Sequence, residues 1–434
     1  MKNKNINLLK LRASYGRAGQ SVTGAGRYPY QSTFASGTGY AFGYSQSTIP
    51  GFYESMAGNA NNKWEISDML NIGLDWDFWN KKLYGSLDIF KEWRSNILVE
   101  RSTIPNTLGV AVAKDSYGKA ETKGLEVTIG HRNHVGKFNY YVEGMLTYNT
   151  NKITEMDETE PNVEWQRKTG KRIYDYTSVA GLYESSFNGG VGGWNIYKFE
   201  QWATDPNLIA TSQQDAIDHP EKYPYNSASP KTGQQLGTAV FKDLNGDRQI
   251  DSNDMTPDTY TIIPELIPTI TLGFEYKGLD AHATLTAYLN RDVFLSPAIG
   301  WSGWGNQGTH EVVNCWGYYT DDPLDPRNIN AKYPRPTYGG YNPIDSERST
   351  GTYQNDIWIQ NGNYLSLRNI EVGYSLPKQL IAKAGMTKCR FYFTGYNLFN
   401  WSGLPDGCDP EKPMGYVWWY PKTHSFTFGV NIGF

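Results

Sequence analysis

Oxygen-bearing residues recur at a regular spacing between residues 243 and 254. The residues concerned are Asp243, Asn245, Asp247, Gln249, Asp251 and Asp254. Their spacing is that of a twelve-residue calcium loop, in which the seventh position gives a backbone carbonyl. The pattern predicts a structural Ca²⁺ site that stiffens a loop. An Asx-rich turn without metal is the alternative, because Arg248 stands where the sharp turn of such a loop favours Gly.

Other motifs that could suggest catalysis or metal binding lack the sequence context that these functions require. Ser116 and Lys119 match an S-x-x-K pattern, but a turn and a strand follow instead of a helix, and no Ser-Asp-Asn motif accompanies them. The three cysteines form no C-x-x-C pair, so a structural zinc site is not expected. Whether Cys315 and Cys408 pair is left open. We therefore expect no enzyme and no organic cofactor.

Aromatic residues are concentrated in the long segments between the predicted strands. Exposed rings in such segments can stack on sugar faces or on peptide side chains, but they can equally pack the loops together. The candidate substrate-binding residues are Trp301, Trp304, Trp316, Tyr318 and Tyr319.

Hydrophobic residues alternate with polar ones along much of the chain, a period typical of β-strands and not of helices. The clearest case is the C-terminal run, where Phe426, Phe428, Val430, Ile432 and Phe434 occupy every second position. Ten strands of about nine to eleven residues are predicted, which is the length a tilted strand needs to cross a bilayer. The alternating runs that mark these strands lie at residues 9–15, 70–78, 83–89, 125–129, 138–148, 270–276, 279–289, 365–376 with a slip near Asn369, 390–400 and 425–434.

Long and short connections alternate between these strands. Residues 79–82, 131–137 and 277–278 form short turns, whereas the segments near 150–267 and 292–355 are long. Outer-membrane barrels have this pattern, with short turns in the periplasm and long loops outside the cell. Because long and short connections alternate, the last strand ends on the side of the short turns, which places the C-terminus in the periplasm. Aromatic packing in a soluble β-sandwich is the competing interpretation.

Composition narrows the class of protein further. The 434 residues carry a formal net charge of −4, and 15% of them are aromatic. The aromatic content argues against disorder, and no run of about 18 apolar residues predicts a transmembrane helix. The absence of a basic domain argues against a dedicated nucleic-acid binder.

Several motifs together resemble one known family. Residues 8–16, 363–377 and 389–399, followed by Asp409-Pro410-Glu411 and the terminal strand, resemble the C-terminal end of SusC/RagA-type TonB-dependent transporters. The resemblance implies an antiparallel barrel of about 22 strands around an N-terminal plug. It also implies outer-membrane import of oligosaccharides or, less often, peptides, powered through TonB and covered by a SusD-like lid lipoprotein.

The sequence is shorter than this family, and we expect residues 1–434 to form the C-terminal part of the barrel. Residues 150–267 would form the largest extracellular loop and contain the calcium-like segment 243–254. No plug, TonB-contact segment or secretory signal is recognised, which suggests a split gene, an internal start or a truncated fragment. A passive porin-like barrel and a secreted β-rich carbohydrate-binding protein are the rival interpretations.

Overall fold

The computed structural model describes most of the chain. The described residues are 5–21, 28–44, 46–173, 196–208, 219, 236–237, 239–247, 250, 252–256, 260–294, 314–333, 355–357, 359–405, 408–411 and 422–434. Among these residues, no helix is both long enough and apolar enough to cross a membrane.

Ten strands form one antiparallel sheet in which every strand pairs with its neighbours in sequence order. They are β1 (Ile6–Gln20), β6 (Glu65–Phe78), β7 (Leu83–Val99), β9 (Asp115–Val135), β10 (Phe138–Glu155), β13 (Leu266–Tyr276), β14 (Leu279–Tyr288), β17 (Tyr364–Ser375), β18 (Lys388–Ser402) and β19 (Ser425–Gly433). The ten predicted strands are thus confirmed, but several are longer than expected, and β9 has 21 residues.

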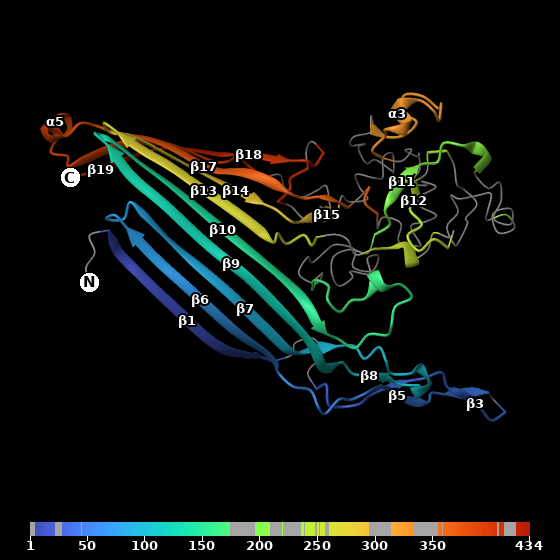
Figure 1. Cartoon of the computed structure of the whole chain (residues 1–434). Coiled ribbons are helices and arrows are strands. Elements are labelled where there is room, and N and C mark those ends of the chain that lie inside the picture. Colours follow the sequence, from blue (N-terminus) through green and yellow to red (C-terminus); the bar gives the residue numbers. More distant parts are fainter. Residues whose placement is uncertain are drawn as a thin grey trace.

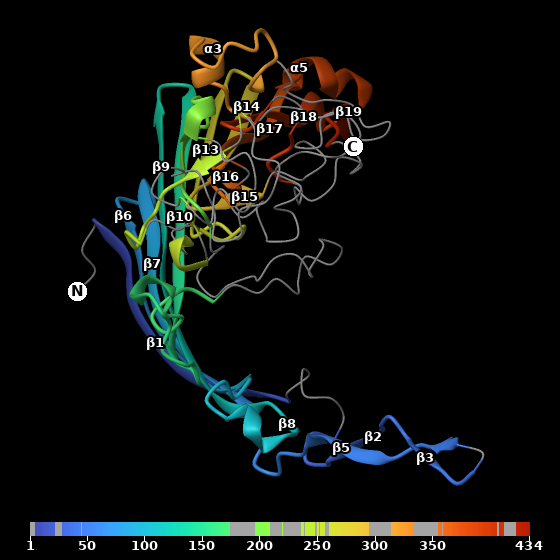
Figure 2. The ribbon, with the colours of Figure 1, turned by 90° about the vertical axis from the view of Figure 1, so that its right-hand side faces the viewer.

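The sheet is open and curves like part of a cylinder wall (Figure 2). Its two edges are β1 and β19, which do not pair with each other. The chain therefore forms a portion of a barrel and not a small closed barrel.

Short turns lie at one end of the sheet, together with both chain termini (Figure 1). Trp79, Asn80 and Lys81 adopt positive φ angles between β6 and β7, and Lys277-Gly278 does the same between β13 and β14. The turn predicted at residues 131–137 is tighter than expected, because β9 continues to Val135 and β10 begins at Phe138. The connection from β17 to β18 contains α5 (Lys378–Ile381) and the 3-10 helix η7 (Ala382–Ala384).

Long connections lie at the opposite end and contain small elements of their own (Figure 1). Those between β1 and β9 form a projecting arm, and those further along the chain form a layer of loops. The arm contains β2 (Thr33–Ser36), β3 (Tyr40–Phe42), β4 (Ser47–Ile49), β5 (Phe52–Ala57), η1 (Asn106–Leu108) and β8 (Ala111–Val112). The loop layer contains η2 (Glu164–Gln166), β11 (Phe199–Trp202), η3 (Pro206–Leu208), β12 (Ala239–Phe241), η4 (Ser252–Asp254), β15 (Asp292–Phe294), α3 (Pro326–Ile329) and β16 (Ile359–Asn361).

The register of the sheet collects the alternating apolar residues on one face, called here the apolar face. Leu11 pairs with Leu74, and Leu74 pairs with Leu87. At the other side of the sheet, Phe393 pairs with Phe428. These side chains are unusually exposed for their type: Leu11 is 74% and Phe428 is 72% accessible. A soluble domain would bury a continuous surface of this kind.

The apolar face has a definite height. Along β10 it extends from Phe138 to Tyr148, ten residue steps. At about 3.4 Å per residue and a tilt of about 45°, those steps span roughly 24 Å, close to the apolar band of an outer-membrane barrel. Beyond Tyr148 the next outward positions carry polar and charged side chains, including Lys152.

A β-bulge interrupts the register between β17 and its neighbours. Against β14, Leu285 pairs with Leu367 but its neighbour Thr284 pairs with Asn369, so Arg368 is the extra residue of β17. The slip predicted near Asn369 is therefore confirmed. Because a one-residue shift exchanges the two faces of a strand, the bulge keeps Leu365 and Val372 on the same apolar face.

On the opposite, polar face, large planar side chains lie across glycines of the neighbouring strand. Tyr141 of β10 lies across Gly273 of β13, its register partner. A Cβ atom on Gly273 would overlap the Tyr141 ring. Glycine weakens a strand by itself, and an aromatic ring laid over it restores packing across the pair.

We expect Gly273→Val to destabilise the protein by about 1–3 kcal/mol, because the branched side chain displaces the Tyr141 ring. The matched control is Gly144→Val on the apolar face, where the only neighbour of a Cβ atom is the Ile129 carbonyl oxygen at 3.9 Å. Denaturant unfolding of the full-length protein that carries this chain, monitored by the gel shift of folded barrels, measures both variants. Equal stability of the two variants would contradict the packing role assigned to Gly273.

Candidate functional site: the polar face and the loop layer

The polar face is cross-linked by arginines that each hold two carboxylates. Arg12 of β1 donates to Asp75 of β6 at 2.8 and 2.9 Å, and to Asp88 of β7 at 2.7 and 2.9 Å. All four contacts are charge-assisted, and both pairs are bidentate, the geometry that a guanidinium favours. One side chain thus connects three strands.

A second cluster connects three strands at the other side of the sheet. Arg390 of β18 donates to Glu371 of β17 at 2.7 Å, and its Nε donates to Asp280 of β14 at 3.0 Å. The hydroxyl of Thr394 donates to the other oxygen of Glu371 at 2.8 Å. Since these groups are partly buried and mutually paired, they serve to fix the wall and carry no arrangement typical of catalysis.

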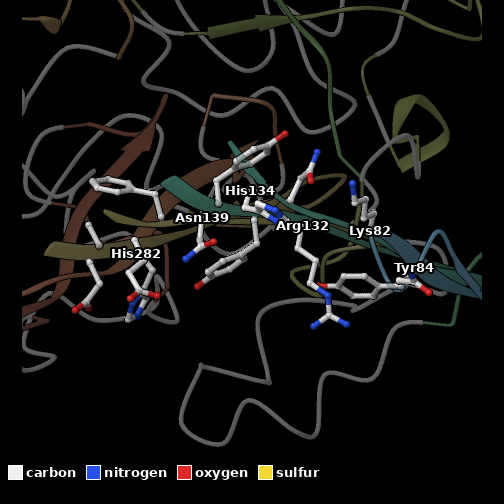
Figure 3. Close-up of a pocket in the computed structure, with 14 residues that line it drawn as sticks. Lys82, Tyr84, Arg132, His134, Asn139 and His282 are labelled. Atoms are coloured by element: carbon white, nitrogen blue, oxygen red, sulfur yellow. The ribbon is translucent and has the colours of Figure 1, made fainter. Parts of the chain in front are cut away.

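A hollow of about 730 Å³ lies at the turn end of the sheet, between the two arginine clusters along the strand order. Figure 3 shows Lys82, Tyr84, Arg132, His134, Asn139 and His282 around it. The Tyr84 hydroxyl donates to Glu143 at 2.8 Å, and the Arg132 guanidinium lies over the Tyr84 ring at 5.2 Å from its centroid. Because these lining side chains are polar or charged, the hollow suits contact with a polar surface. Among the described residues, no group of three His, Cys, Asp or Glu side chains could hold a metal ion.

The loop layer has a small hydrophobic core of its own, and Trp316 lies at its centre. Trp316 is fully buried and packs in one cluster with Ile196, Trp202 and Val293. The indole nitrogen of Trp202 donates to the Ala331 carbonyl at 2.9 Å. Trp316 is therefore a packing residue, which corrects its place among the candidate substrate-binding rings.

Two other candidate rings remain accessible. Tyr318 and Tyr319 are 46% and 56% exposed and contact each other edge to face, with ring centroids 4.8 Å apart. The Arg327 guanidinium lies over the Tyr319 ring at 5.2 Å. Trp301 and Trp304 lie outside the described residues, as do Trp418 and Trp419 near the last strand. Tyr318 and Tyr319 are thus the candidate rings that the structure leaves available to a ligand.

The calcium-like segment forms a compact turn held by its own side chains. Asp243 accepts from the Gly246 amide at 2.6 Å, and Asn245 accepts from the Asp247 amide at 3.0 Å. Asp254 is fully buried and accepts from the Leu244 amide at 2.8 Å. Gly246 adopts a positive φ angle, so a sharp turn lies there. Residues 248, 249 and 251 lie outside the described part of the chain.

A stack of arginine and tyrosine side chains attaches the loop layer to the sheet. The rings of Tyr288 and Tyr364 are stacked at 4.7 Å, with Arg291 over Tyr364 and Arg368 over Tyr288. Burial lowers the pKa of Arg291 from its usual value, yet the guanidinium is held by the carbonyl oxygens of residues 262, 362 and 410, at 3.0, 3.1 and 2.7 Å. Sequence reasoning did not single out this stack.

The Asp409-Pro410-Glu411 motif lies on the same stack. The Pro410 carbonyl accepts from Arg291, and the Glu411 carboxylate receives Arg368 at 2.7 Å and Lys422 at 2.6 Å. The bulge at Arg368 is what lets that side chain reach Glu411. The Asp409-Pro410-Glu411 motif was therefore the sequence signal for this arginine–tyrosine stack, called here the anchor. The spacing of the motif did not reveal that function.

The three cysteines form no disulfide in this structure. Cys315 is buried in the core of the loop layer, and Cys408 packs against the same core. The two residues come from different long connections and meet at the same core, where both are free thiols in this structure.

Comparison with known proteins places this arrangement in a family. Residues 4–217 match the family described as TonB dependent receptor-like, beta-barrel. TonB-dependent receptor P3 of Formosa agariphila is 25% identical over 99% of the chain, and TonB-dependent receptor SusC of Bacteroides thetaiotaomicron is 26% identical over 99%. The chain spans 40% and 38% of the lengths of these two relatives.

Solved structures show the same fold. The RagAB peptide importer in its open-open state aligns with the whole chain at a TM-score of 0.64 and 17% identity, and the chain covers 41% of that structure's chain. A second RagAB structure, titled a peptide transporter, gives a TM-score of 0.63. The relatives are named as TonB-dependent receptors, and the two solved structures as a peptide importer and a peptide transporter. The two-faced antiparallel sheet, its alternating connections and these matches together show that the chain belongs to the SusC/RagA-type TonB-dependent receptors, as the C-terminal part of their β-barrel.

Proposed function

We propose that the chain forms part of the wall of an outer-membrane importer that takes up oligosaccharides or peptides with energy supplied through TonB. The observation that carries the proposal is the apolar face, an exposed band roughly 24 Å high with a polar face behind it. Lipid is the solvent that favours such a band, because water disfavours exposed Leu and Phe side chains at this density. The polar face then lines the interior of the barrel.

The alternation of connections supports an orientation. The loop layer and the projecting arm lie at one end of the sheet, and the tight turns and both termini at the other (Figure 1). In barrels of this kind the long loops are extracellular, so the C-terminus at Phe434 lies in the periplasm. A SusD-like lipoprotein would cover the loop layer, and TonB would act through a part of the protein that precedes this region in the family.

Tyr318 and Tyr319 are the residues proposed to contact the substrate. Their exposed edge-to-face pair offers a ring surface that suits the apolar face of a sugar or a peptide side chain. The RagAB structure is named as that of a peptide importer. The name of the sequence relative, TonB-dependent receptor SusC, states no substrate. Both substrate classes therefore stay within the proposal.

Labelling of intact cells that produce the full-length protein tests the orientation. In a background with the native cysteines replaced by serine, we expect a membrane-impermeant maleimide to label a Tyr319→Cys variant from outside. A Lys277→Cys variant, in the turn between β13 and β14, should react only after the outer membrane is permeabilised. Labelling of the Lys277→Cys variant in intact cells would overturn the proposed orientation.

Uptake measurements separate the importer from its rivals. In cells that depend on the full-length protein, uptake of its oligosaccharide or peptide should stop when a protonophore collapses the inner-membrane gradient or when TonB is removed. A passive porin-like barrel would keep its uptake under both conditions. A secreted carbohydrate-binding protein would be recovered outside the membrane fraction.

We further propose that residues 243–254 bind Ca²⁺, with Asp243, Asn245, Asp247, the Gln249 carbonyl, Asp251 and Asp254 as the ligand set. The Asx bonds of Asp243 and Asn245 support it, since they bring carboxylate and amide oxygens into one tight turn. The burial of Asp254 also supports it, because an acidic side chain removed from water needs compensating positive charge or hydrogen bonds. The ion would order the loop and take no part in chemistry.

For the full-length protein, we expect calcium to raise the melting temperature, with a dissociation constant of about 10⁻⁴–10⁻³ M. Asp247→Ala should remove the effect, and so should Asp254→Asn, which keeps an acceptor for the Leu244 amide but loses the charge. Asp322→Ala, elsewhere in the loop layer, is the control and should respond as the unmodified protein does. No calcium effect in the unmodified protein would leave an Asx turn without metal.

A further inference from the structure

A group of basic side chains lies on the apolar face, at the edge nearest the long loops. Lys91 of β7 and Lys123 of β9 are register partners. Lys152 of β10 pairs with Glu121, which is two residues from Lys123 on β9. One carboxylate lies among them: Glu121 accepts from the ammonium groups of Lys91 and Lys152, each at 3.0 Å. The Lys91 ammonium also lies over the Trp93 ring, 5.1 Å from its centroid.

This lysine group carries more positive charge than its own carboxylate neutralises. Two of the three ammonium groups, those of Lys91 and Lys152, pair with Glu121, and among the described residues Lys123 forms no ion pair. Like charges placed directly opposite each other, as Lys91 and Lys123 are, destabilise a pair of strands. The side chains of Lys91 and Lys152 are still 40% and 50% exposed, so an external anion has access.

The position of the group matches a membrane interface. Toward the long loops, the continuous apolar rows of β9 and β10 end at Leu125 and Tyr148, and Lys123 and Lys152 follow within two to four positions. The other end of the band is different, because its outward positions are occupied by Phe138, Tyr276 and similar side chains. Lys81, Lys137 and Lys277 at that end lie in the turns between the strands.

We propose that Lys91, Lys123 and Lys152 bind the phosphate of a lipid headgroup in the leaflet next to the long loops. Neighbouring strands are about 4.8 Å apart, so three ammonium groups on three adjacent strands span roughly 10 Å, the size of a phosphorylated sugar headgroup. The acyl chains of the same lipid would lie on Leu125 and Ile89, directly below. Binding is thus continuous from the charged edge into the apolar band.

The lipid proposed is that of the outer leaflet, which rests on the orientation argued under the proposed function. Binding itself does not depend on that orientation, because it is measured on detergent-solubilised protein. If cell labelling reversed the orientation, lipid binding would persist and only the leaflet would change. If lipid binding failed, the importer proposal would be unaffected.

Native mass spectrometry of the full-length protein in detergent, titrated with lipid A, tests the site. Lipid A is a phosphorylated glucosamine disaccharide lipid, and the same lipid after phosphatase treatment is the matched probe. We expect the phosphorylated form to bind at least about tenfold more tightly. Lys123→Gln should weaken it about three- to fivefold, and Gln at positions 91, 123 and 152 together at least about tenfold. Equal binding of both forms would overturn the proposal.

Two further variants separate a phosphate site from a general effect of charge. Replacement of Lys81, Lys137 and Lys277 by Gln removes three cations from the turn end and should leave lipid A affinity unchanged. Glu121→Gln removes the competing carboxylate and should strengthen binding of the phosphorylated form. If Glu121→Gln weakens that binding, or if the turn-end variant weakens it as much as the triple variant at 91, 123 and 152, the proposed site is wrong.

Discussion

Strand register is the constraint on which the rest of this structure depends. A backbone N–H or C=O group facing lipid has no water to bond, so each must be paired with the next strand. The pairing also decides the two faces, because a slip of one residue would move every Leu and Phe of a strand to the polar side. The observed register places Leu11, Leu74 and Leu87 side by side and their polar neighbours behind them. At the bulge at Arg368, β18 has a register shift of its own, and pairing continues on both sides of it.

The sequence predicts the strands well where one face meets lipid, and poorly beyond that band. All ten strands were identifiable because alternation is a local property of the chain. The start of β9 was not: the structure places it at Asp115, whereas alternation becomes clear only near Leu125. Between these points both faces carry polar residues, such as Glu121 and Thr122, so the period of two is absent although the backbone remains paired.

In the candidate site, too, the features formed by residues close in sequence were predictable, whereas those formed by residues far apart in sequence were not. The Asx turn around Asp243 was predictable, because its hydrogen bonds join residues two or three positions apart. The anchor was not, since Arg291 meets the Pro410 carbonyl across 119 positions. Trp316 was misassigned for a related reason: an aromatic residue in a loop looks the same in sequence whether its ring is buried or exposed. Only the packing of the loop layer separates Trp316 from Tyr318.

The polar face shows how a wall can be charged and rigid at once. Arg12 lies across Gly73 and Arg390 lies across Gly373, just as Tyr141 lies across Gly273. In each case the missing side chain gives a planar group room to lie flat on the neighbouring strand, and the two guanidinium groups also reach a carboxylate one strand further on. A guanidinium held this way meets two carboxylates, which neutralise its charge on the polar face. In the proposed importer, selection of a substrate would then fall to the loop layer, where the exposed rings lie, while the polar face would supply a fixed passage.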